Sequence, residues 1–406
     1  MQFKTLLPAA LAVAAVSAQS DNATAAGNLT SVLSSNSNLT ALNTLLASYP
    51  AIAESLGNRT NITLFAPSNT ALSTLNSSGL LAQAASVDGL IQSLLSYHVL
   101  DGMFYAENIT TTPQFPHTSL NSSTYSNVTG GQVVECRLDG MTAEIISGLK
   151  SVANVTQANV NFTGGVIHVV DNVLMIPSNV STTASAANLT AFLGLLNATA
   201  LTSTVDGASD ITIFAPSNSA FQDVASGLSN LTTADLTNIT TYHVLNNSVL
   251  YSSMLSNSTV PTLGGGNLTI TYENGTVFIN SARVVNADIL ISGGVMHVID
   301  SVLNPNATMA RANDTEGAGA ATAFSGASSE TAVPFTSGIA TATTTIEALV
   351  TSTTQVAVSY TPAASGAGAA GGSGSGSSSS SGIAAAPTGA IGAAALFGGA
   401  AFLANF

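Results

Sequence analysis

Four of the five histidines, the residue type best suited to proton transfer and metal binding, recur as two matching pairs. His98 and His243 each follow a tyrosine in the string Tyr-His-Val-Leu, whereas His168 and His297 each stand three residues before an aspartate. A zinc site needs three or four converging ligands, and each string supplies a single histidine. In a strand, a histidine and an aspartate three residues apart also point to opposite faces. We therefore expect buried histidines, hydrogen-bonded to backbone or carboxylate groups, rather than a metal site.

Nucleophilic and nucleotide chemistry has little support in the sequence. The nearest approach to a G-x-S-x-G string, Gly-Ser-Gly-Ser-Gly at residues 372–376, lies in a Gly/Ser tract that cannot form the strained turn of a hydrolase nucleophile. There is no Walker loop and no H-E-x-x-H motif. A glycosidase needs only two carboxylates and no motif, so a secreted carbohydrate-active enzyme stays open as the less favoured alternative. We predict that the protein is not an enzyme and holds no cofactor.

Charge and cysteine content narrow the function classes further. The 406 residues include 6 Lys and Arg against 20 Asp and Glu, a formal charge of -14, and such a chain repels the phosphates of nucleic acids. Cys136 is the single cysteine, so no disulfide can form within the chain. It shares one face of an expected strand with Val134 and Leu138, and we interpret it as a buried small hydrophobic residue rather than a reactive thiol.

Glycosylation is the expected source of hydration for a chain with only 6% charged residues. The sequence contains 22 Asn-x-Ser/Thr sequons, which indicates passage through the secretory pathway. The candidates for occupancy are Asn58, Asn76, Asn108, Asn121, Asn127, Asn154, Asn230, Asn246, Asn257 and Asn274.

Both ends of the chain carry expected targeting signals. Residues 1–18 have one lysine, a short apolar stretch and a Val-Ser-Ala cleavage pattern, which predict a signal peptide. Residues 310–382, rich in Ser, Thr, Ala and Gly, predict a disordered glycosylated stalk. The uncharged tail, residues 383–406, is typical of a glycosylphosphatidylinositol-anchor signal, so we expect the protein at the plasma membrane, in the cell wall or both. The expected attachment residues are Ser380, Ser381 and Gly382.

A long internal repeat sets the architecture. Three strings occur twice in the same order, beginning at Ile62 and Ile211, at Tyr97 and Tyr242, and at Gly164 and Gly293. One folding unit is therefore built twice. We assign residues 27–177 to a first domain and residues 185–306 to a second, with residues 178–184 as a short linker.

The sequence of each copy predicts a few helices in its first half and an antiparallel sheet in its second half. Residues 62–67 favour a buried strand that a proline ends, and the Ser-Asn pair after it can cap a helix. Apolar residues at helical spacing predict another helix over residues 87–97. Alternating strings around Asp139-Gly140 and Asn274-Gly275 predict hairpins. The strands that follow Gly-Gly late in each copy are expected to lie beside the strand at residues 62–67 and beside its counterpart in the second copy.

These strings, in this order, resemble the two signature regions and the intervening Tyr-His motif of fasciclin domains. With the secretion signal, stalk and tail, the chain resembles the fasciclin-like surface glycoproteins of fungi and plants. The resemblance implies an α+β fold of two tandem domains, each a β-wedge with flanking helices. It also implies a role in adhesion or in contact with the extracellular matrix.

The resemblance further suggests residues that contact a partner, which would be a cell-surface or matrix protein or a wall glycan. The Tyr-His pairs match the motif linked to receptor binding in animal members, although their apolar neighbours favour a core role. An Asp-Ile adhesion element occurs in the second copy alone. The candidates are Tyr97, His98, Tyr242, His243, Asp288 and Ile289. Two functions therefore remain, an adhesive display protein and a passive structural glycoprotein that spaces and hydrates the surface.

Overall fold

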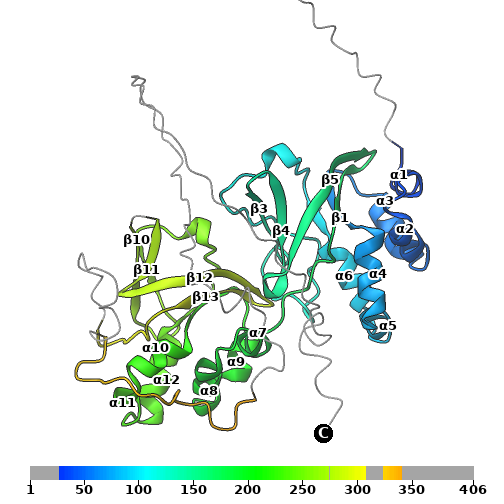
Figure 1. The fold of residues 1–406 in the computed structure, drawn as a ribbon. Helices are drawn as coiled ribbons and strands as arrows, with labels where there is room; N and C mark the ends of the chain where they lie inside the picture. The colour runs from blue at the N-terminus through cyan, green and yellow to red at the C-terminus, as the bar shows by residue number, and fades with distance from the viewer. Residues whose placement is uncertain (1–26, 274, 308–322, 341–406) are drawn as a thin grey trace, which may run out of the picture.

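The computed structural model describes residues 27–273, 275–307 and 323–340, which form two domains built on one plan (Figure 1). The expected signal peptide, Asn274, the anchor attachment residues and the apolar tail lie outside these ranges. Within them, no helix has the length and apolar character needed to cross a bilayer.

The first domain contains a six-stranded sheet in the order β2-β1-β6-β5-β4-β3. β1 comes from the helical half of the copy and pairs in parallel with β6, as the repeat suggested. The strands from the second half of the copy, β3 to β6, pair antiparallel as predicted. The parallel pair makes the sheet mixed, because the long chain segment between β1 and β6 supplies the crossover that such a pair needs. The strands are β1 (Ile62–Pro67), β2 (Val99–Asp101), β3 (Glu135–Asp139), β4 (Thr142–Ile146), β5 (Val152–Phe162) and β6 (Gly165–Val170).

The second domain repeats this plan with a seven-stranded sheet in the order β8-β7-β13-β12-β11-β10-β9. Its parallel pair, β7 with β13, has the register of β1 with β6. A Cβ atom on Gly165 or Gly294 would lie 1.9 or 2.0 Å from a carbonyl oxygen of the neighbouring strand, so the repeated glycine lets these strands pair. The strands are β7 (Ile211–Pro216), β8 (Val244–Leu245), β9 (Ser258–Pro261), β10 (Asn267–Glu273), β11 (Thr276–Ile279), β12 (Ala282–Ile291) and β13 (Gly294–Ile299).

Helices gather at one side of the sheet in each domain (Figure 1). Ser68 and Ser217 cap α4 and α10 as predicted, each accepting a backbone N–H bond of 3.2 Å. The helix expected over residues 87–97 begins later, because Gly89 adopts a left-handed φ of 73° immediately before it. In the first domain the helices are α1 (Leu29–Ser35), α2 (Thr40–Ala47), α3 (Pro50–Gly57), α4 (Asn69–Ser77), α5 (Leu80–Ala85), α6 (Leu90–Tyr97) and the 3₁₀ turns η1 (Ala106–Asn108) and η2 (Gly148–Lys150).

Residues 178–184, expected to form a linker, include the start of the second domain's first helix. The Asn179 side chain caps this helix with a 3.0 Å bond from Thr182 N–H. Val180, Thr183 and Ala184 are buried, so packing overrides the modest helix propensity of the valine and the threonine. The helices of this domain are α7 (Val180–Ala186), α8 (Thr190–Ala198), α9 (Thr202–Asp206), α10 (Asn218–Asp223), α11 (Ala225–Leu228), α12 (Thr233–Tyr242) and η3 (Ser252–Met254).

Residues 323–340, here called the strap, lie against the helices of the second domain (orange in Figure 1). The prediction of a disordered stalk over residues 310–382 was therefore wrong for this segment. Phe324 is buried, and Phe335 packs edge-on against Phe221 with 6.1 Å between ring centroids. Two aromatic side chains bury enough apolar surface to order a segment whose overall composition favours disorder.

Candidate functional site

His98 and His243 each join the end of a helix to the chain that follows the last strand of the domain. The His98 ring donates from Nδ1 to Leu94 O over 2.8 Å and accepts at Nε2 from Leu174 N–H over 2.9 Å. His243 makes the same two bonds, of 2.7 and 3.0 Å, in the second domain. Because one partner is a carbonyl and the other an N–H group, each ring must be neutral and carry its proton on Nδ1.

The burial of these two rings excludes them from acid–base chemistry near neutral pH. Burial lowers the pKa of both His98 and His243 to about 4, against a smaller opposing effect of the carbonyl bond. Protonation would also place an Nε2–H against the backbone N–H that now donates to it. The two imidazoles therefore act as fixed connectors within the fold.

His168 and His297 use the opposite tautomer for a second pair of connections. Nε2 donates to Phe104 O over 2.7 Å in the first domain and to Leu250 O over 2.8 Å in the second. Nδ1 accepts a backbone N–H from the adjacent strand in both. Burial lowers the pKa of both rings. The predicted buried histidines, bonded to backbone groups, are thus confirmed in both copies.

The tyrosines of the Tyr-His pairs are also inside the fold. Tyr97 donates its hydroxyl proton to Val133 O over 2.9 Å, and Tyr242 donates to Asn267 O over 2.7 Å. The Tyr242 hydroxyl in turn accepts from the Asn280 side chain over 2.9 Å. Each tyrosine thereby ties the helix end to the far part of its sheet.

Asp288 serves as a cap rather than as a surface charge. It lies in a bulge of β12 with a left-handed φ of 59°, is 3% exposed, and accepts the backbone N–H of Ser252 over 2.7 Å. Asn159 has the same place in the first domain, with φ 59° and a 3.0 Å bond from Ala106 N–H. Asp and Asn are the side chains that tolerate this backbone conformation best. The difference between the copies is therefore an exchange of one capping residue for another.

None of the six expected partner-contacting side chains reaches the surface, and Ile289 is completely buried in the core. The structure gives each of them a place inside the fold. A role in partner contact stays a prediction for these residues. Because they are buried, they would affect binding indirectly, by holding the strands and loops that contact the partner.

The two domains meet along a hydrogen-bonded junction that the sequence strings do not indicate. The Gln132 side chain donates to Ile291 O over 3.1 Å, and the Asn127 N–H donates to Ser292 O over 2.7 Å. Thr129 donates its N–H and its hydroxyl to the Asp210 carboxylate, over 2.8 and 2.5 Å. No sequence motif marks these residues, because hydrogen-bond partners that are about 80 to 165 positions apart in the chain produce no local pattern.

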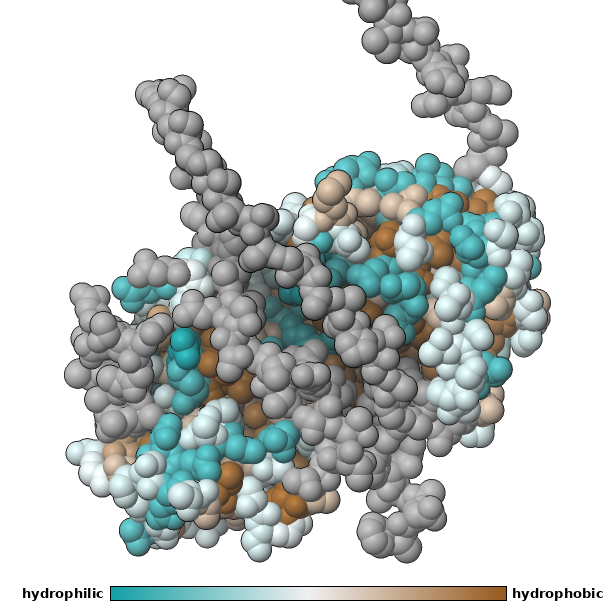
Figure 2. Space-filling view, in the orientation of Figure 1, coloured by the Kyte–Doolittle hydropathy of each residue, from teal (hydrophilic) through white to brown (hydrophobic). Residues whose placement is uncertain are grey.

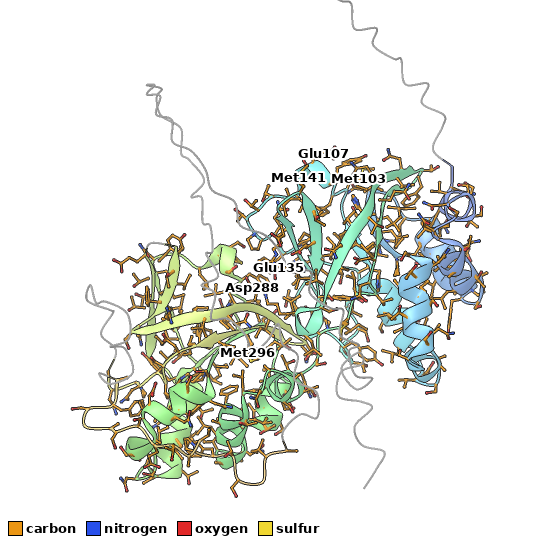
Figure 3. All side chains as sticks on the ribbon, in the orientation of Figure 1. Met103, Glu107, Glu135, Met141, Asp288 and Met296 are labelled. Carbon is orange, nitrogen blue, oxygen red and sulfur yellow. The ribbon has the colours of Figure 1, made fainter. Side chains whose placement is uncertain are left out.

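Buried aromatic and charged groups complete the junction. Phe115 stacks on Tyr251 with 4.2 Å between ring centroids and 10° between planes. Glu135 is 1% exposed and binds Lys150 over 3.2 Å, while Asp288 approaches it from the second domain (Figure 3). Burial and the Asp288 charge raise the pKa of Glu135, and Lys150 opposes that shift. The domains are thus joined by specific polar contacts as well as by packing.

The described residues offer little for catalysis. Nowhere among them do three His, Cys, Asp or Glu side chains form a group able to hold a metal ion. A cavity beside η3, lined by Ser252, Val277 and Val284, has a volume of about 10 Å³, room for about one water. Cys136 is buried, and burial raises the pKa of its thiol, so it behaves as the predicted core residue.

The surface is polar but weakly charged, and its sequons face outward. On the face drawn in Figure 2, hydrophilic and weakly polar residues cover most of the described area, with hydrophobic residues in small separate patches. Three of the 22 sequon asparagines, Asn22, Asn274 and Asn313, lie outside the described residues, and none of the other 19 is buried. Asn127, Asn154, Asn179 and Asn188 are half-buried.

Comparison with known proteins gives a consistent family. A model of the fasciclin domain matches residues 37–177 and again residues 187–305. A fasciclin-like arabinogalactan protein of Arthroderma benhamiae is 36% identical over 270 residues, which cover 66% of this chain and 64% of that protein. Fasciclin-like arabinogalactan protein elcF of Phaeosphaeria nodorum is 30% identical over 69% of this chain and 89% of its own length. Human periostin is 27% identical over 63% of this chain and 30% of its own length.

Proposed function

The chain belongs to the fasciclin family, and we propose on that basis that it displays two adhesive domains at the cell surface or in the cell wall. Its partners would be cell-surface or matrix proteins or wall glycans. The proposal assigns no catalytic role, since four of the five histidines and the single thiol are committed to the core.

The observation that carries the proposal is the outward position of the sequons. A sequon can occur anywhere by chance, but 19 of them on described residues without one buried asparagine indicates selection for glycan attachment. Attached glycans would hydrate a surface that has few charges of its own. The name arabinogalactan protein, given to two of the relatives, fits such a glycoprotein.

A binding experiment tests adhesion directly. The secreted domain pair with its strap, residues 27–340, is presented to an array of wall glycans and to cells of the same origin, with and without enzymatic removal of N-glycans. If the protein is adhesive, its binding should be saturable, and unlabelled protein should compete for the binding sites. Separate expression of the two domains then tests whether the second domain contributes more, as its Asp288-Ile289 element led us to expect.

One observation favours the passive alternative, a structural glycoprotein without a specific ligand. All six residues expected to contact a partner are buried. If binding to every glycan and cell surface rises linearly with concentration and is not competed, the passive function replaces adhesion.

We also propose that a lipid anchor holds the protein at the plasma membrane, although the tail itself lies outside the described residues. A phosphatidylinositol-specific phospholipase should release the protein from isolated membranes, and deletion of residues 390–406 should send it to the medium. The contrary result is a chain that resists the lipase and, after extraction with detergent, still ends at Phe406. That chain would span the bilayer instead.

A further inference from the structure

The strap packs against α8, α10 and α11 of the second domain, and the surface of these helices that it covers is here called the groove. Two glycines let it approach closely. A Cβ atom on Gly194, in the middle of α8, would lie 1.8 Å from Phe335 O, and one on Gly227 would lie 3.1 Å from the Ala327 Cβ. Because glycine is unfavourable inside a helix, Gly194 is explained by the strap rather than by α8 itself.

Polar groups of the groove bind the backbone of the strap. Gln222 donates from its side chain to Thr331 O over 2.9 Å, and its own carbonyl accepts Glu330 N–H over 3.0 Å. The Ser226 hydroxyl accepts Ser328 N–H over 2.7 Å. With Phe324 and Phe335 packed on the same helices, the groove recognises a peptide by its main chain and two aromatic side chains.

The first domain has no equivalent groove. Asn69 and Asn218 accept the N–H of Ala41 and Ala191 in matching positions, so the two domains can be aligned through α2 and α8. In that alignment Thr44 takes the place of Gly194. A side chain there would collide with a strap, so the groove is particular to the second domain.

We propose that this groove also accepts the strap of a second copy of the chain, so that exchange of residues 323–340 joins two copies. All the contacts described above lie between strap and groove, and a strap from another molecule would make the same ones. Residues 308–322 connect the domain to its strap and could span about 50 Å when extended, enough to reach a neighbour. The chain's own strap competes at an effective concentration on the order of millimolar, so exchange is favoured where copies are crowded.

Two complementary variants of the secreted chain, residues 19–382, remove this competition. The acceptor has Phe324→Ala and Phe335→Ala, which weaken its own strap and leave its groove open. The donor has Gly194→Ala, which blocks its groove, strengthens the helix and leaves its strap free. Sedimentation velocity should find each variant monomeric alone and a 1:1 complex of doubled mass in the mixture. Thr44→Ala, the matched change in the first domain, is the control and should not convert the wild-type chain into a donor.

A mixture that remains monomeric, while both variants keep the wild-type circular dichroism spectrum, would overturn the proposal. So would a complex that still forms when the acceptor also carries Gly194→Ala, because the contact would then lie elsewhere. If the donor fails to fold, a labelled synthetic peptide of residues 323–340 takes its place. Saturable binding of that peptide to the acceptor, lost when both phenylalanines are alanine, supports exchange, and the absence of binding refutes it.

Discussion

Acidification should destabilise both domains through the two connecting histidines, His98 and His243. Burial lowers their pKa from 6.5 to about 4. Because the pKa is lower in the folded than in the unfolded state, this stabilisation is complete above about pH 6.5 and is lost as the pH falls toward 4. A shift of one unit corresponds to about 1.4 kcal/mol, so at about pH 4.5 each domain should have lost about 2.5 kcal/mol from this one residue.

The effect of one histidine can be isolated by substitution. His243→Gln removes the titrating ring while keeping a side-chain amide, and should cost about 1–3 kcal/mol at neutral pH because the amide N–H and C=O cannot take the positions of both ring nitrogens. Its free energy of unfolding should then fall by about 2.5 kcal/mol less than that of the wild type between about pH 7.5 and about pH 4.5. Urea unfolding followed by tyrosine fluorescence measures this, since the chain has 8 Tyr and no Trp.

Other titrating groups also contribute to the pH dependence of the free energy of unfolding. Their contributions must cancel when the wild type is compared with His243→Gln. Burial lowers the pKa of His168 and His297, which adds to the acid destabilisation, whereas the raised pKa of Glu135 opposes it. These groups are present in both proteins, so the difference reports His243. His117→Gln, which removes an exposed imidazole, is the control. If His243→Gln shows the full wild-type loss of stability on acidification, the connecting role assigned to this ring is wrong.

Three further changes test the remaining assignments. Tyr242→Phe should lower the free energy of unfolding by about 1–3 kcal/mol, because the Asn267 carbonyl and the buried Asn280 amide each lose a bond, and an unchanged urea midpoint would contradict the bonding role. Asp288→Asn should change stability by less than about 1 kcal/mol, since Asn159 fills this position in the first domain, and lost adhesion with unchanged melting would make Asp288 a partner contact. Asp210→Ala should increase hydrogen exchange at residues 127–132 while both domains stay folded, and unchanged exchange would show that the Thr129 bonds do not hold the junction.

Local patterns predicted the parts of the fold that are local. The Pro-Ser-Asn turn after β1, the hairpin around Asp139-Gly140 and the capping by Ser68 each depend on a few neighbouring residues. The pairing of β1 with β6 is long-range, yet the repeat exposed it because both strings return together in the second copy. Repetition therefore supplied information that a single copy would not contain.

The errors have two physical origins. Composition averages over a segment, so a stretch dominated by Ser, Ala and Gly concealed Phe324 and Phe335, which are enough to hold the strap on the second domain. Gly194 inside an apolar helical pattern was the available signal, because an isolated helical glycine usually marks close packing. At the junction, Gln132 and Asp210 have no such signal, since their partners belong to the other domain.

The polar residues shared by the two copies are explained by backbone groups that the fold leaves without partners. Thr63 and Thr212 each donate to a loop carbonyl, over 2.7 and 2.8 Å, and each accept a loop N–H over 2.8 Å. Asp171 and Asp300 accept a strand N–H over 2.7 Å in the same way. An unmade bond at such a group costs about 1–3 kcal/mol, so the loss of these side chains would remove a large part of the stability of each copy. Residues common to both copies therefore report the fold, and recognition of a partner should be sought where the copies differ, at the glycosylated surface, the domain junction and the strap groove.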